Sequence, residues 1–164
     1  MSSTFHRHRF DKVEDYLHHR PPYLLVDRIV ELGEDSIVTE MRMTGEEFFA
    51  QGHFPGMPVL PGAMMQELST QSAGILIAAN FNPLAEYDTH DPDANEVALG
   101  VLVRVKLANY KGFVRPGDQL RVRVVLEDRI AEVFQFAATI TVDDKTVMKI
   151  RFQLANIPTE QLRG

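Results

Sequence analysis

The sequence predicts an α+β fold in which an antiparallel sheet of about six strands wraps round one long central helix. Three observations support this prediction. A long, mostly apolar segment over residues 63–79 has helical character, and the segments around it alternate apolar and polar residues as strands do. No internal repeat or linker divides the 164 residues, so we expect one domain over residues 1–164.

The central helix is predicted to begin abruptly at residue 63. Six helix-breaking residues come just before it: Gly52, Pro55, Gly56, Pro58, Pro61 and Gly62. They exclude a regular helix or a central strand before residue 61. Beyond Leu68 the segment is apolar nearly all round, which is typical of a helix buried in a core rather than laid on a surface.

Strands are predicted on both sides of this helix. Residues 23–32 and 36–43 precede it and are separated by the turn Gly33-Glu34-Asp35. After it come an extended segment and three alternating apolar faces, over residues 97–108, 120–126, 134–142 and 148–154. These strands supply the sheet of the predicted α+β arrangement.

Two segments lack the periodicity of helices and strands. Residues 1–10 are expected to form a loose tail. Residues 80–96 contain two prolines and five acidic residues but few large apolar ones, which predicts a long, acidic, mobile excursion. The excursion is interpreted as a lid, a subunit contact or a tolerated insertion.

Composition narrows the function. The net charge of −6 argues against nucleic-acid binding, which needs a basic surface. The absence of cysteine excludes a disulfide framework and thiolate chemistry, and agrees with a cytoplasmic location. No apolar run is long enough for a membrane span, and the polar N-terminus does not resemble a signal peptide. Residues 101–164 are locally basic, which suits an acidic partner or a phosphate group.

Three groups suited to acid–base chemistry are predicted to lie near each other. His53 is in the breaker-rich loop, Gly62 opens the helix with a free N–H, and Glu67 follows five residues later. A neutral imidazole can take a proton, a helix N-terminus favours a developing oxyanion, and a carboxyl group can protonate a leaving group. Gln71, one turn after Glu67 on the same face, is interpreted either as orienting Glu67 by a hydrogen bond or as a buried amide satisfied elsewhere. No second His or Cys at ligand spacing supports a metal site at His53.

The sequence also resembles a known family over most of its length. The stretch His53-Phe-Pro-Gly-Met-Pro-Val-Leu-Pro-Gly62, followed by Glu67 and Gln71, is similar to the active-site signature of bacterial 3-hydroxyacyl-ACP dehydratases. Residues 19–28 and 114–119 resemble two further motifs of that family. The resemblance implies a hot-dog fold, and Glu rather than Asp at position 67 resembles the non-isomerising type. The extra residue Ala50 and the long segment 80–96 depart from the family pattern.

The resemblance implies roles for individual residues. His53 would abstract the C2 proton of the acyl thioester, and Glu67 would protonate or orient the departing hydroxyl. The Gly62 N–H would polarise the thioester carbonyl, and the Val59 carbonyl would fix the tautomer of the imidazole. The residues expected to bind substrate are Gly62, Val59, Gln71, Phe54 and Phe49. No metal or redox cofactor is expected. The substrate is expected to be carried on the phosphopantetheine arm of acyl carrier protein.

The same resemblance implies an assembly. His53 and Glu67 would come from different subunits of a homodimer with two composite sites, and three dimers would form a hexamer. The expected reaction is dehydration of (3R)-3-hydroxyacyl-ACP to trans-2-enoyl-ACP in fatty-acid biosynthesis. Two alternatives stay open: another hot-dog acyl-thioester enzyme, such as a thioesterase or a dehydratase of polyketides or modified lipids, and a non-catalytic regulator that binds acyl thioesters.

Overall fold

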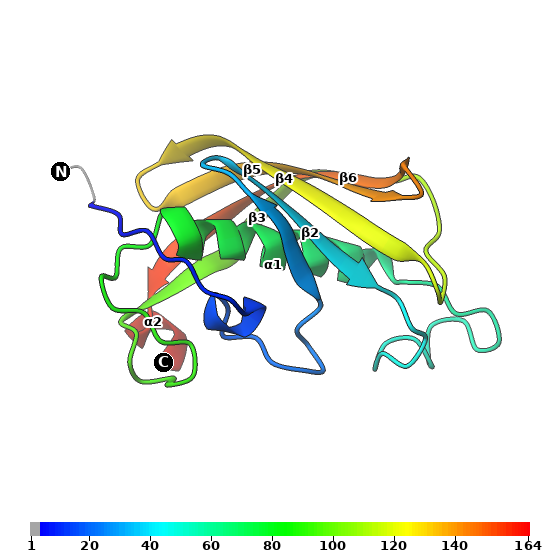
Figure 1. Ribbon diagram of the computed structural model, residues 1–164, viewed down its shortest axis with the longest axis horizontal. Coiled ribbons are helices and arrows are strands. Elements are labelled where there is room, and N and C mark those ends of the chain that lie inside the picture. Colours follow the sequence, from blue (N-terminus) through cyan, green and yellow to red (C-terminus); the bar gives the residue numbers. More distant parts are fainter. Residues whose placement is uncertain (1–3) are drawn as a thin grey trace.

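A computed structural model of the protein describes residues 4–164 and has one six-stranded sheet around one long helix (Figure 1). The elements in chain order are a 3₁₀ helix (Val13–Asp15), β1 (Arg28–Leu32), β2 (Ser36–Arg42), α1 (Gly62–Asn80), β3 (Val97–Tyr110), β4 (Gln119–Ile130), β5 (Val133–Val142), β6 (Lys145–Pro158) and α2 (Glu160–Arg163).

The strand order of the sheet is β1-β2-β4-β5-β6-β3, and each neighbouring pair is antiparallel. The sheet curls over α1, which lies along its concave face (Figure 1). The predicted fold class, an antiparallel sheet of about six strands round one central helix, is confirmed. Because β1 has 5 residues and β3 has 14, the two edges of the sheet differ in length.

The core forms where α1 meets the sheet. From Leu68 to Asn80 every residue of α1 is buried, as the all-round apolar sequence predicts. The inward face of the sheet is built from rows of paired residues, such as Leu126, Phe136 and Phe152 on β4, β5 and β6. The rings of Phe136 and Phe152 stack with their centroids 5.7 Å apart. None of the helices in residues 4–164 is long and apolar enough to cross a membrane.

The first predicted strand is shorter than expected. Pairing with β2 covers Arg28–Leu32, whereas residues 23–27 lie outside any strand. The Gln71 side chain explains part of the difference, since its amide accepts from the Leu25 N–H at 2.8 Å and donates to the Tyr23 carbonyl at 2.9 Å. A side chain of α1 thus takes backbone groups that a strand would need.

The expectation of a loose tail over residues 1–10 is wrong for residues 4–10, and residues 1–3 lie outside the described part. The His6 N–H donates to the Asn82 carbonyl, just beyond α1, at 2.8 Å, and the His8 N–H donates to the Ala79 carbonyl in its last turn at 2.9 Å. Phe5 packs edge to face against Phe81, and Phe10 packs against Tyr16. Apolar contacts at the end of α1 fix the segment, although its sequence has no periodicity.

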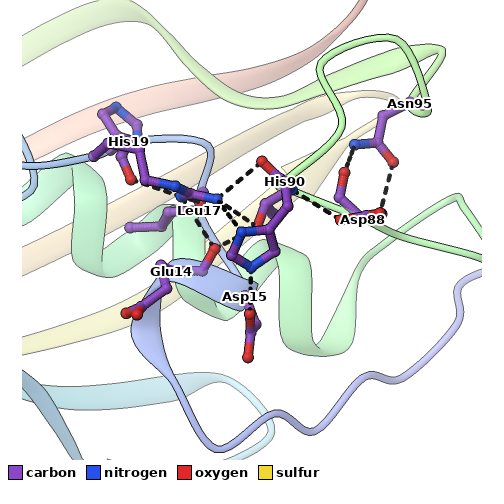
Figure 2. Close-up of polar contacts among 9 residues, drawn as sticks. Glu14, Asp15, Leu17, His19, Asp88, His90 and Asn95 are labelled. Atoms are coloured by element: carbon purple, nitrogen blue, oxygen red, sulfur yellow. Dashed lines mark hydrogen bonds and ion pairs between the residues drawn. The ribbon is translucent and has the colours of Figure 1, made fainter.

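The excursion over residues 80–96 is also anchored rather than loose. Arg20 Nη2 donates to the Thr89 carbonyl at 3.0 Å and lies 3.2 Å from His90 Nδ1. His90 Nε2 lies 2.7 Å from Asp15 Oδ1, and the buried Asn95 lies within the same excursion (Figure 2). Tyr87, Thr89, His90 and Asn95, which lie among the acidic residues that suggested mobility, contact residues 14–20 and hold the excursion.

Candidate active site

Glu67 lies in the second turn of α1, and its side chain is 19% exposed. Gln71 Nε2 donates to Glu67 Oε1 at 3.0 Å, and Thr70 Oγ1 lies 3.4 Å from Oε2. The hydrogen bond between Gln71 and Glu67 is therefore present. Because the same amide group also bonds to Tyr23 and Leu25, the carboxylate is tied both to its own helix and to the segment before β1.

Two aromatic side chains that the sequence did not assign to the site also approach this carboxylate. His19 Nε2 lies 3.6 Å from Glu67 Oε1, and the His19 ring stacks on Tyr23 with centroids 5.9 Å apart. Burial raises the pKa of Tyr23, and the Glu67 charge together with its hydrogen bond raises it further. Both residues belong to the motif His19-Arg20-Pro21-Pro22-Tyr23, which resembles the family but which the sequence did not link to the active site.

The imidazole of His19 is an unusual neighbour for a carboxylate. Burial lowers the pKa of His19, Glu67 opposes this, and Arg20 lowers it further. The ring is therefore neutral at pH 7, and its contact with Glu67 is not an ion pair there. Its Nδ1 atom is buried and has no hydrogen-bond partner within residues 4–164.

His53 is held in the loop before α1 by one side-chain hydrogen bond. Its Nδ1 lies 3.1 Å from the Val59 carbonyl oxygen, and since only an N–H can donate to a carbonyl, Nδ1 carries the proton. Nε2 is then the basic nitrogen. The next residue, Phe54, has a φ of 59°, in the left-handed region that is unfavourable for a bulky side chain. Its ring centroid lies 4.5 Å from that of His53, so the strained backbone places an aromatic ring against the imidazole.

Gly62 is the first residue of α1, where a backbone N–H has no acceptor within the helix. Pro61 precedes it with a φ of −59°, and the Pro61 carbonyl accepts from Met64 and Met65 at 2.9 Å and 3.1 Å. A Cβ at Gly62 would lie 2.8 Å from Cε1 of Tyr110 on β3. Any larger residue at position 62 would push the half-exposed Tyr110 ring away from the start of α1.

Glu67 lines one cavity, and the loop that carries His53 borders a different one. A cavity of about 450 Å³ is lined by Glu67 and Gln71 of α1 together with His19, Tyr23 and others. A second hollow, of about 500 Å³, lies beside the His53 loop. Its lining residues are Phe54, Met57, Pro58, Val59, Phe113, Arg115 and Pro116. The structure of one subunit therefore brings Glu67 with Gln71, and Phe54 with Val59, but does not join the two sets in one cavity.

Phe49, the remaining predicted substrate residue, lines neither cavity. It is half-buried, packs against the core and meets Phe48 edge to face at 5.2 Å. Its neighbour Phe48 stacks on Tyr23, which lines the Glu67 cavity. Within residues 4–164 no three His, Cys, Asp or Glu side chains gather as metal ligands do.

Comparisons with known proteins identify the family of this chain. The family model described as a FabA-like domain matches residues 17–151. The FabZ 3-hydroxyacyl-[acyl-carrier-protein] dehydratase of Cupriavidus taiwanensis is 41% identical over 135 residues, which cover 82% of this chain and 84% of that protein. The FabZ of Acinetobacter baylyi is 34% identical over 150 residues, covering 92% and 95% of the two chains.

Solved structures support the fold. A chain of the dehydratase heterocomplex ApeI:P from Xenorhabdus doucetiae superposes with a TM-score of 0.74 at 17% identity, covering 94% of this chain and 97% of that one. A hypothetical thioesterase protein from Streptococcus pneumoniae solved with coenzyme A superposes with a TM-score of 0.58 at 14% identity, covering 80% of this chain and 85% of that one. The match of the family model and the two sequence relatives confirm the predicted family: this chain belongs to the FabA-like family and is similar to its FabZ 3-hydroxyacyl-[acyl-carrier-protein] dehydratases.

Proposed function

We propose that this protein dehydrates (3R)-3-hydroxyacyl-ACP to trans-2-enoyl-ACP in fatty-acid biosynthesis, in the cytoplasm and without a metal or redox cofactor. The observation that carries the proposal is the pair of oriented acid–base groups. His53 presents a basic Nε2 because Val59 holds Nδ1, and Glu67 presents a carboxyl group to a cavity that is partly lined by aliphatic side chains. FabZ relatives at 34–41% identity carry this activity in their names.

The first chemical step is removal of a proton from C2 of the acyl thioester. His53 Nε2 takes this proton, and the electron pair of the C–H bond moves toward the thioester carbonyl, whose oxygen becomes negative. The Gly62 N–H, at the positive end of α1, donates to that oxygen. Such proton transfer by a positioned side chain contributes about 10²–10⁴-fold to the rate.

The second step breaks the bond between C3 and its hydroxyl oxygen. Glu67 gives its proton to that oxygen, which leaves as water, and the electron pair held on the enolate forms the double bond between C2 and C3. Gln71 keeps the carboxyl group pointed into the cavity through its hydrogen bond to Oε1. The double bond stays between C2 and C3, as in a non-isomerising dehydratase. Proton transfer from His53 back to Glu67 resets both groups.

We also propose that the site is completed by a second subunit. Glu67 lines the cavity along α1, whereas His53 lines neither that cavity nor the hollow beside its own loop, so a single chain does not offer both groups to one substrate in either of them. β3 is a 14-residue edge strand, and apolar side chains are exposed along it: Leu102, Val103, Val105, Leu107 and Tyr110. A long apolar edge invites pairing with a second copy. Since Tyr110 also contacts Gly62, such pairing would occur next to the start of α1.

Acyl carrier protein is the proposed carrier of the substrate, and basic side chains near the His53 loop suit an acidic partner. Arg115 lines the hollow beside His53, and its guanidinium group lies 5.7 Å from the centroid of the Phe113 ring. Lys111 is exposed nearby in the chain. Arg115→Glu is expected to raise KM for ACP-linked substrate and to leave KM for the same acyl group on pantetheine nearly unchanged.

The proposal is tested by incubating the protein with 3-hydroxyacyl-ACP and with the matching enoyl-ACP, and by following the acyl carrier protein with mass spectrometry. Loss or gain of the mass of one water, abolished in His53→Ala, is expected. Release of free acyl carrier protein instead would identify a thioesterase. Tight binding with no change in mass would identify a non-catalytic acyl-thioester binder.

A further inference from the structure

The cavity that holds Glu67 runs along one side of α1. Glu67, Gln71 and Gly74 all line it and follow one another at helical spacing, so it extends about 10 Å along the helix axis. β3 forms the opposite side and runs antiparallel to α1. Tyr110 meets Gly62 at the start of the helix, and a Cβ built on Gly100 would lie 3.3 Å from the Cα of Gly74. The first residues of β3 therefore lie beyond Gly74, on the side away from the chemistry.

The excursion and the C-terminal residues close this side of the cavity. Tyr87, Pro92 and Asn95 of the excursion line it, as do Val97 at the start of β3 and Leu162 of α2. α2 is tied to this region, because the N–H of Thr159 donates to the Glu96 carbonyl at 2.8 Å and its hydroxyl donates to the Asn95 carbonyl at 2.7 Å. Residues from three separate stretches of chain thus form one wall.

Hydrogen bonds fix this wall in place. The Tyr87 hydroxyl donates to the Tyr16 carbonyl at 2.9 Å, and burial raises the pKa of Tyr87, so the hydroxyl stays protonated and can donate. The Asn95 side chain donates to the Asp88 carbonyl at 2.6 Å (Figure 2). It also lies 3.0 Å from His18 Nε2. Because these hydrogen bonds hold the wall, a longer ligand can displace it only at a cost in free energy.

We propose that residues 87–95, together with Leu162, form the end wall of the acyl-binding cavity and set the longest acyl chain that the enzyme accepts. This inference rests on the proposed function, which places the reacting carbons beside Glu67 and the acyl tail further along α1. The tail then grows toward Tyr87 and Leu162 as methylene groups are added. A chain that outgrows the cavity must displace the wall.

The test compares four variants with the wild-type protein: Tyr87→Ala, Leu162→Ala, Tyr87→Phe and Glu86→Ala. The first two open the wall. Tyr87→Phe keeps the ring and loses only its hydroxyl, and Glu86→Ala changes an exposed residue of the excursion that does not line the cavity. Dehydration rates are measured on 3-hydroxyacyl-ACP, and dissociation constants on saturated acyl-pantetheine thioesters, with acyl chains from about four to sixteen carbons, since one methylene group changes selectivity by about 10-fold or more.

Tyr87→Ala and Leu162→Ala are expected to move the length limit to longer chains in both assays, with at least about a 10-fold gain in kcat/KM for the first length that the wild type rejects. Glu86→Ala should keep the wild-type length profile, and Tyr87→Phe should shift it less than Tyr87→Ala, because the ring stays while the hydrogen bond to the Tyr16 carbonyl is lost. Leu162 is 55% exposed, so Leu162→Ala tests the wall even where Tyr87→Ala fails to fold. Unchanged length profiles in folded opening variants overturn the inference. No dehydration at any length, with a length limit in binding that still moves, refutes the proposed reaction and leaves the wall standing.

Discussion

The loop that carries His53 and the helix that carries Glu67 differ in how firmly each holds its functional group. His53 depends on one side-chain hydrogen bond to Val59, in a segment whose neighbours Phe54 and Met57 are 57% and 72% exposed. Glu67 stands on a buried helix, with Gln71 and Thr70 bonded to it. The acid is held by the fold of its own subunit, whereas the loop that holds the base leaves large apolar side chains uncovered.

This difference suggests how the two halves of the site meet. Exposed aromatic and methionine side chains beside a strained loop are costly in an isolated subunit and gain free energy when a second surface covers them. In the proposed dimer, the His53 loop of one subunit would pack against the Glu67 helix of the other, which is the rigid half of the site. Predictions that separate the two halves test this interpretation directly.

The largest expected effect is the loss of turnover when either group is removed. His53→Ala and Glu67→Gln are each expected to lower kcat/KM by at least about 10²–10⁴-fold, because each removes a proton-transfer group. The melting temperature of His53→Ala should stay close to that of the wild type, since a half-buried loop imidazole contributes little to the core. Near-normal turnover in either folded variant would rule out the role assigned to that residue.

Mixing two variants that are each expected to be inactive, His53→Ala and Glu67→Ala, tests whether the site is shared between subunits. If each site takes His53 from one subunit and Glu67 from the other, random exchange between His53→Ala and Glu67→Ala dimers should restore about a quarter of the wild-type activity, because half of the dimers are mixed and each has one intact site. Exchange is verified by native mass spectrometry on subunits of different mass. Confirmed mixed dimers without activity would contradict composite sites.

Local patterns in the sequence were enough to predict the rigid half. The helix was expected over residues 63–79 and spans Gly62–Asn80, and the contact between Gln71 and Glu67 follows from helical spacing alone. The alternating strands likewise specified the sheet. These features depend on residues that are close in sequence, so their periodicity carries the information.

The features that could not be predicted depend on distant residues. The approach of His19 to Glu67 joins positions 48 residues apart, and the contact between Asp15 and His90 joins positions 75 apart. Composition alone suggested a mobile excursion, because acidic residues and prolines are typical of loops. The contacts between this excursion and residues 14–20 cannot be predicted from local sequence patterns, because the two segments meet only in the folded chain.

The next prediction weakens the rigid half without touching the carboxyl group. Gln71→Leu removes the donor to Glu67 and leaves the buried Leu25 N–H without its acceptor, which should cost about 1–3 kcal/mol of stability. We expect kcat to fall about 10-fold because Glu67 is no longer oriented. Ser69→Ala is the matched control, since it removes a buried side-chain hydrogen bond of the same helix, to the Met65 carbonyl, away from Glu67. Similar losses of kcat in both variants would show that Gln71 acts only on stability.

The smallest expected effect concerns the pH dependence of the same half. Burial lowers the pKa of His19 below its usual 6.5, so the unfolded chain binds more protons than the folded one between the two values. The contribution of His19 to stability is therefore complete above pH 6.5 and is lost as the pH falls toward the lower, folded-state pKa. Because the His19 side chain is 37% exposed, the effect should stay below about 1 kcal/mol.

His19→Phe isolates this effect, since the new ring can keep the stacking on Tyr23 but cannot titrate. Thermal unfolding measured from neutral to mildly acidic pH should show a smaller loss of stability in His19→Phe than in the wild type. His18 also has a pKa lowered by burial, so His18→Phe should remove a separate part of the same slope. An unchanged slope in His19→Phe would mean that folding does not shift the pKa of His19, whereas a larger loss of stability in His19→Phe than in the wild type would mean that the ring is protonated beside Glu67 in the folded protein.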